Sequence, residues 1–131
     1  MSEQTDRNIE IVKEGYEAFS TGDIETLMSL FDDNIEWVQP GDSTISGTYH
    51  GKREVDEYLS RLGEKSPTVK HLRFLADGDM VVALTEVAVG DQRGQGAQVL
   101  TLRDGKTVRV QQYTDTAMME RVYGRKQVAA G

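Results

Sequence analysis

Apolar residues near the start of the chain recur at spacings of three and four positions. The stripe consists of Ile9, Val12, Tyr16 and Phe19. This period predicts one face of a helix over residues 6–21. Gly22 suits the left-handed turn that ends such a helix, and Asp23 can cap the first amides of a second, shorter helix. The second helix takes its apolar face from Ile24, Leu27, Leu30 and Phe31.

The pattern between residues 32 and 67 is more broken. Polar residues 32–34 end the helix pair, and residues 35–38, Ile-Glu-Trp-Val, predict a short strand. Residues 39–51 are rich in glycine and other turn formers and are expected to be irregular. A third helix, ended by Gly63, is predicted from the spacing of Val55, Tyr58, Leu59 and Leu62.

After Pro67 the chain becomes rich in Val, Leu and Thr, which favours strands over residues 69–76, 80–89, 97–103 and 107–114. Asp-Gly turns at 77–79 and 104–106 predict tight hairpins, and residues 90–96 are expected to form a longer loop. Helices followed by antiparallel strands predict an α+β fold with the helices on one face. The tail, 117–131, is expected to hold a short helix near 118–123 and to fray at its Ala-Gly end.

Length and composition exclude several classes of protein. The 131 residues are expected to form a single domain over 1–131 with its core at about 8–116. The chain has no cysteine and no apolar run of about 20 residues, so disulfides, thiolate metal sites and membrane spans are not expected. The first residues lack the apolar stretch of a secretory signal, so none is expected. A net charge of −7 with scattered basic residues argues against nucleic acid as a partner. A cytoplasmic location is the simplest expectation.

Four phrases in order resemble the nuclear transport factor 2-like superfamily, in its SnoaL-like branch. They are residues 16–23, 35–41, 74–83, and 104–106 leading to 113–115. This superfamily includes ketosteroid isomerase, limonene epoxide hydrolase, scytalone dehydratase and SnoaL-like polyketide cyclases. The resemblance implies a cystatin-like cone, with three N-terminal helices on a strongly curved, mostly antiparallel sheet. It also implies a conical pocket for one small apolar molecule.

Asp115 is the candidate catalytic residue that the resemblance implies. The epoxide hydrolase and cyclase branches use an aspartate in a Tyr-x-Asp phrase at the end of the last strand as general base or acid, and Asp115 matches that position. Burial between apolar walls would raise its pKa toward working pH. The chemistry implied is a cofactor-independent isomerisation, cyclisation, dehydration or hydrolysis. Alternatively, Asp115 caps the segment that begins at Thr116.

The partners of that aspartate depart from the known enzymes. The Arg-x-Asp pair of the epoxide hydrolases is replaced by Val87 and Val89, and the aspartate base of ketosteroid isomerase by Gln39, before Pro40. The oxyanion aspartate of the isomerases falls near Val99. The chain is therefore not expected to be a standard ketosteroid isomerase or limonene epoxide hydrolase. A non-catalytic binding protein of the same fold remains an alternative.

The substrate-binding candidates combine flat apolar surface with hydrogen-bonding groups. They are Tyr16, Trp37, Tyr58, Gln112 and Tyr113. His71 could shuttle protons, but its alternation with Leu72 and Phe74 predicts that it faces solvent or a partner. His50 and His71 lack a third ligand at a recognisable spacing, so no metal site is expected.

The third hypothesis is a protein-interaction module, in which the outer face of the sheet builds a homodimer or a mixed complex. A homodimer is compatible with either of the other hypotheses. This face is expected to carry Arg73, Glu86 and Arg109. If Glu86 were buried instead, it would be a second acid–base candidate.

Overall fold

The computed structural model describes residues 2–127. The elements are α1 (Glu3–Thr21), α2 (Ile24–Ser29), β1 (Phe31–Gln39), β2 (Gly47–His50), α3 (Gly51–Gly63), β3 (Thr68–Asp77), β4 (Met80–Val89), β5 (Gln92–Arg103), β6 (Lys106–Tyr113) and α4 (Thr116–Tyr123). The predicted short C-terminal helix is α4. The Ala-Gly end that was expected to fray lies outside the described residues.

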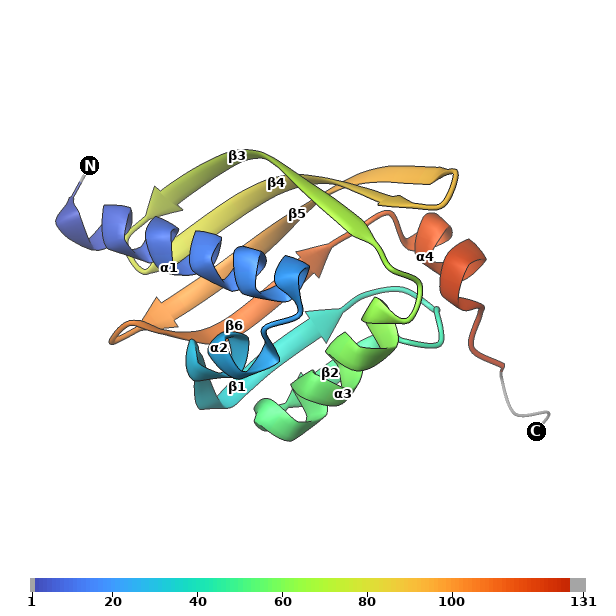
Figure 1. Ribbon diagram of the computed structural model, residues 1–131, viewed down its shortest axis with the longest axis horizontal. Helices are drawn as coiled ribbons and strands as arrows, with labels where there is room; N and C mark the ends of the chain where they lie inside the picture. The colour runs from blue at the N-terminus through green and yellow to red at the C-terminus, as the bar shows by residue number, and fades with distance from the viewer. Residues whose placement is uncertain (1, 128–131) are drawn as a thin grey trace.

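All six strands form one sheet, in the order β2-β1-β6-β5-β4-β3. Neighbouring strands are antiparallel except β1 and β6, which run parallel. Helices α1 and α3 cover the same face of this twisted sheet: α1 lies across β3 and β4, and α3 lies against β1 (Figure 1). The α+β architecture with a mostly antiparallel sheet is therefore confirmed.

Local signals in the sequence set the ends of the first two helices. The Ser2 hydroxyl accepts a hydrogen bond from the Thr5 amide, and Gly22 ends α1 with a left-handed φ of 76°. Asp23 then caps α2 by accepting from the Thr26 amide and hydroxyl at 3.2 and 2.7 Å. These hydrogen bonds stabilise the carboxylate and lower the pKa of Asp23. The predicted helix stop and cap are confirmed.

Two stretches expected to be irregular are part of the sheet. Gly47–His50 forms β2 and pairs with the end of β1, which itself starts earlier than predicted, at Phe31. The expected loop over residues 90–96 is a tight turn, and Gln92–Gly96 pairs with β4. Glycine weakens strand propensity, so Gly94 and Gly96 indicated a loop. Their lack of a side chain instead allows close packing, since a Cβ at Gly96 would lie 2.7 Å from the Tyr113 carbonyl oxygen.

The core fills the space between the helices and the covered face of the sheet. Its most deeply buried side chains come from β1, α3, β4 and β6 and include Ile35, Val55, Tyr58, Val81 and Val110. Within residues 2–127, no helix is both long and apolar enough to cross a bilayer.

A β-bulge in β3 changes which side chains face the helices. His71 pairs with Thr85 whereas Arg73 pairs with Leu84, so Leu72 is an extra residue without a partner. Leu72 therefore points outward and is 49% exposed. His71 and Phe74 lie on the covered side, with ring centroids 5.4 Å apart. The prediction that His71 faces away from the core was wrong, because strict alternation breaks at the bulge.

Candidate functional site

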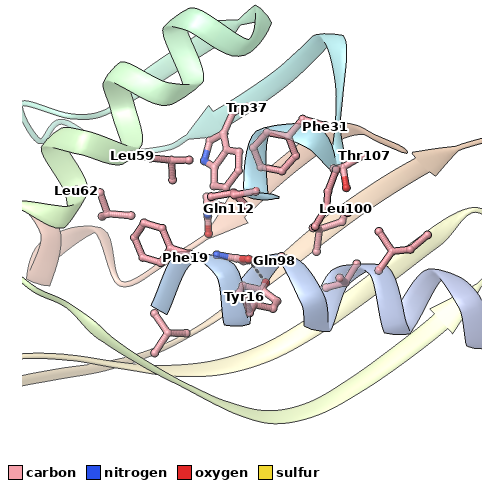
Figure 2. A pocket seen from close by; sticks show the side chains of 16 residues that line it. Tyr16, Phe19, Phe31, Trp37, Leu59, Leu62, Gln98, Leu100, Thr107 and Gln112 are labelled. Atoms are coloured by element: carbon pink, nitrogen blue, oxygen red, sulfur yellow. Dashed lines mark hydrogen bonds between the residues drawn. The ribbon is translucent and has the colours of Figure 1, made fainter. Parts of the chain in front are cut away.

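A cavity of about 80 Å³ lies between the first three helices and strands β1, β5 and β6. Its walls are mostly aliphatic and aromatic, and include Val12, Phe19, Leu27, Phe31, Leu59 and Leu100. Figure 2 shows Phe19, Phe31, Leu59 and Leu100 converging on a common space. The apolar stripe of α1 thus forms one wall and the covered face of the sheet the other.

Two glutamine amides from neighbouring strands contribute to the polar part of the cavity wall. Gln98 on β5 pairs directly with Gln112 on β6, so both side chains project to the same side of the sheet. The Tyr16 hydroxyl on α1 donates a hydrogen bond to Oε1 of Gln98 (Figure 2). Burial raises the pKa of Tyr16 far above its ordinary value, so this hydroxyl stays protonated. The cavity therefore offers hydrogen-bonding groups that carry no charge.

Trp37 adds a further hydrogen-bond donor to the wall. Its side chain is buried, and among residues 2–127 its indole Nε1 has no hydrogen-bond partner. The nearby Tyr58 hydroxyl instead donates to Oε1 of Gln39 at 2.8 Å. Burial raises the pKa of Tyr58. The adjacent indole N–H of Trp37 lowers this pKa by a smaller amount, although it makes no well-formed hydrogen bond. The Tyr58 ring packs against the Trp37 ring, with centroids 5.5 Å apart, and Tyr58 does not line the cavity.

The expected position of Asp115 in the apolar hollow was wrong. Asp115 is exposed and precedes α4, where its Oδ1 accepts a hydrogen bond from the Met118 amide at 3.0 Å. The capping alternative therefore describes its position. Tyr113 is also outside the cavity: it is 58% exposed, because it follows the inward-facing Gln112 and must point to the other face.

The cavity wall combines apolar surface with neutral hydrogen-bonding groups. Among the described residues, the side chains that line it include no carboxylate, imidazole or amine. Gln39, at the position of the ketosteroid isomerase base, is buried with its amide bonded to Tyr58 and Thr114. A group that accepts a proton near neutral pH is thus missing from this wall. Residues 2–127 also contain no cluster of three or more potential metal-ligating residues.

A second hollow, an outer groove of about 480 Å³, lies between α1 and β3. Three residues, Tyr16, Phe19 and Val69, line both the cavity and this groove. The groove also contains His71, whose ring centroid is 3.9 Å from that of Tyr16. Burial lowers the pKa of His71 below its ordinary value, so the imidazole is neutral at pH about 7.

The outer face of the sheet carries the three charged residues expected there. Glu86 pairs with Arg93 at 3.7 Å and Arg109 with Glu36 at 3.5 Å. Arg73 follows the bulge and lies opposite Leu84 on the same face. Glu86 is thus not a buried acid–base group in the cavity.

Comparison with known proteins places this geometry in a family. The model of the SnoaL-like domain matches residues 12–110, more than half of the chain. An uncharacterised protein of Mycobacterium tuberculosis is 27% identical over 120 residues, which cover 92% of this chain and 83% of that protein.

Two solved structures are similar over nearly the whole chain. A Xanthomonas campestris protein of unknown function with a cystatin-like fold has a TM-score of 0.84 and 29% identity, covering 90% of this chain and 98% of its own. TerC, crystallised with polyporic acid, has a TM-score of 0.78 and 26% identity, covering 89% and 98%. The chain therefore belongs to the SnoaL-like domain family.

Proposed function

We propose that this protein binds one small, largely apolar molecule in the cavity and leaves it chemically unchanged. The observation that carries the proposal is the composition of the wall: aliphatic and aromatic side chains surround the neutral hydrogen-bonding groups of Tyr16, Gln98 and Gln112. Such walls bind apolar molecules and orient them through a few polar contacts. The crystallisation of TerC with polyporic acid supports an organic ligand for this fold.

Acid–base catalysis at Asp115 is the competing function. It requires the carboxylate to reach a bound molecule, whereas Asp115 is exposed and holds the first turn of α4. The position of this side chain favours binding over catalysis. The chemical identity of the ligand after incubation with the protein separates the two functions.

Trp37 provides a direct test, because it is the only tryptophan of the chain and lines the cavity. Cyclohexanone is larger than the cavity of about 80 Å³ and would extend past Tyr16 into the outer groove. We expect it to change the fluorescence of Trp37 saturably and to bind about tenfold more tightly than methylcyclohexane, since its carbonyl can accept a hydrogen bond from the wall. Gly15→Leu should abolish the response. A Cβ at Gly15 makes only ordinary contacts, with Leu27 and Leu30, and the rest of the new side chain would occupy the cavity.

Asp115→Asn is the control for catalysis, because asparagine also caps helices. We expect this variant to bind cyclohexanone with unchanged affinity, and the ketone recovered from wild type to be unaltered by mass spectrometry and NMR. Altered ketone would contradict the proposal. If the alteration also stopped in Asp115→Asn, catalysis at Asp115 would be established instead.

We also propose that the outer face of the sheet pairs with a second copy of the chain. This face combines exposed Leu72, Leu75 and Tyr113 with both acidic and basic side chains. A surface with positive and negative side chains around apolar residues can pack against a twofold-related copy of itself with opposite charges facing each other. A second copy would also remove the exposed apolar side chains from water.

The oligomeric state tests this second proposal. Light scattering after gel filtration is expected to give twice the mass of one chain for wild type, and the mass of one chain for Leu72→Lys/Tyr113→Lys. Lys65→Glu, in the segment between α3 and β3, is the control that should stay dimeric. A wild type that runs as a monomer at high concentration would refute the pairing.

A further inference from the structure

The cavity alone is too small for most metabolites. A cavity of about 150 Å³ is the size that accommodates benzene, and ligand sites usually span about 300–1,000 Å³. The cavity here measures about 80 Å³ and the adjoining outer groove about 480 Å³. Because the two share walls, a ligand that occupies both would have room of the usual size.

Tyr16 forms the partition between the two spaces together with Phe19 and Val69. Its hydroxyl is bonded to Gln98 on the cavity side, and its ring packs on His71 on the groove side. Rotation of the Tyr16 side chain, at the cost of its hydrogen bond to Gln98, would remove one part of this partition. A bound molecule can therefore extend from the apolar wall of the cavity into the groove.

The groove differs from the cavity in its charged and titratable groups. Nε2 of His71 is buried and has no hydrogen-bond partner within residues 2–127. Lys13 lies above the Phe74 ring, 5.5 Å from its centroid, and its nearest carboxylate, that of Glu10, is 3.8 Å away. Glu17 also lines the groove, but it is an exposed residue whose carboxylate can stay hydrated.

We propose that the ligand is an amphiphilic carboxylic acid, with its apolar end in the cavity and its carboxylate in the groove. The carboxylate would lie beside the Lys13 ammonium and against Nε2 of His71, which movement of the packed Tyr16 ring would uncover. This inference rests on the proposed binding function and specifies the class of ligand. A carboxylate supplies the acceptor that a protonated imidazole and an ammonium both require. An alcohol or ester of the same shape can fill the cavity but lacks the charge that these two groups recognise.

The proposal predicts that binding takes up a proton. Burial lowers the pKa of free His71, whereas a carboxylate against Nε2 would raise the pKa in the complex. Affinity for the acid should therefore increase as the pH falls below the pKa of His71 in the complex. It should stop increasing once the pH is below the pKa of His71 in the free protein. The titratable groups facing His71 from α1 are Tyr16, Lys13 and Glu17, and opposite it on β4 lies the uncharged Thr85.

The experiment compares 4-cyclohexylbutanoic acid with 4-cyclohexylbutan-1-ol by Trp37 fluorescence and calorimetry. We expect the acid-to-alcohol affinity ratio to rise about fivefold to tenfold between about pH 8 and about pH 6. Calorimetry in two buffers of different ionisation enthalpy should show proton uptake for the acid alone. His71→Phe should remove the pH dependence, and His71→Gln, which keeps a hydrogen-bond donor without titrating, should also give a flat profile.

Lys13→Met is expected to weaken binding of the acid about threefold to tenfold at both pH values and to leave the alcohol unchanged. Arg73→Met is the matched control: it removes a positive charge from the other face of β3 and should change neither affinity. If both molecules bind equally and ignore these substitutions, the carboxylate proposal is overturned while cavity binding stands. If neither these molecules nor cyclohexanone binds, both proposals fail.

Discussion

Gly96→Ala is expected to lower the free energy of unfolding by about 1–3 kcal/mol, as overpacked substitutions usually do. An added Cβ would lie 2.7 Å from the Tyr113 carbonyl oxygen and 3.4 Å from Cα of Thr114. Both neighbours are backbone atoms, which cannot turn away as a side chain can. The strain must therefore be relieved by separating β5 from the end of β6.

Urea unfolding of three alanine variants tests the origin of this effect. At Gly94 the closest atom to an added Cβ is the Met118 sulfur at 2.8 Å, the flexible end of a side chain, so Gly94→Ala should cost less than Gly96→Ala. Gly63→Ala, which has no neighbour within 4 Å, should be neutral or slightly stabilising. A loss at Gly96 no larger than at Gly63 would contradict the close approach.

Tyr58→Phe is the second substitution expected to have a large effect, with a loss of about 1–3 kcal/mol in the free energy of unfolding. The Tyr58 side chain is 1% exposed and donates to Oε1 of Gln39, which is equally buried. Removing the hydroxyl leaves that oxygen without this donor and away from water. The cost is that of an unsatisfied buried acceptor, not only of one lost hydrogen bond.

A double-mutant cycle with Gln39→Leu isolates this pair. Because each single variant leaves a buried polar atom of the other residue unpaired, the double variant should be more stable than the sum of the two losses implies. Tyr49→Phe is the control, since Tyr49 is half-buried and donates to the Ile45 carbonyl at 2.6 Å; it should lose only about 0.5–1.5 kcal/mol. Additive losses would show that Tyr58 and Gln39 act independently.

The parts of the fold that could be predicted are those set by neighbouring residues. The helix stop at Gly22 and the cap at Asp23 depend on local conformation, and the Asp-Gly turn before Lys106 does too. Strand β2 depends instead on a partner, since Gly47–His50 is extended because it pairs with β1. No period in so short a segment marks it as a strand.

The candidate site was predictable where side chains alternate regularly along a strand and where apolar residues keep a helical spacing. Of the binding candidates, Tyr16, Trp37 and Gln112 line the cavity, whereas Tyr58 and Tyr113 do not. Consecutive strand residues point to opposite faces, so Gln112 and Tyr113 could not both face a ligand. The inward position of His71 could not be predicted, because it depends on a bulge that leaves no mark in the sequence pattern.

The position of β6 has a consequence for how the chain is completed during synthesis. It is the strand that connects the β1–β2 hairpin to the meander of β3, β4 and β5, and it is the last strand to be made. The sheet therefore cannot become continuous until residues 106–113 have left the ribosome. When the sheet closes, Phe31 pairs with Thr107, which lies far from it in the sequence. Such long-range pairing slows folding.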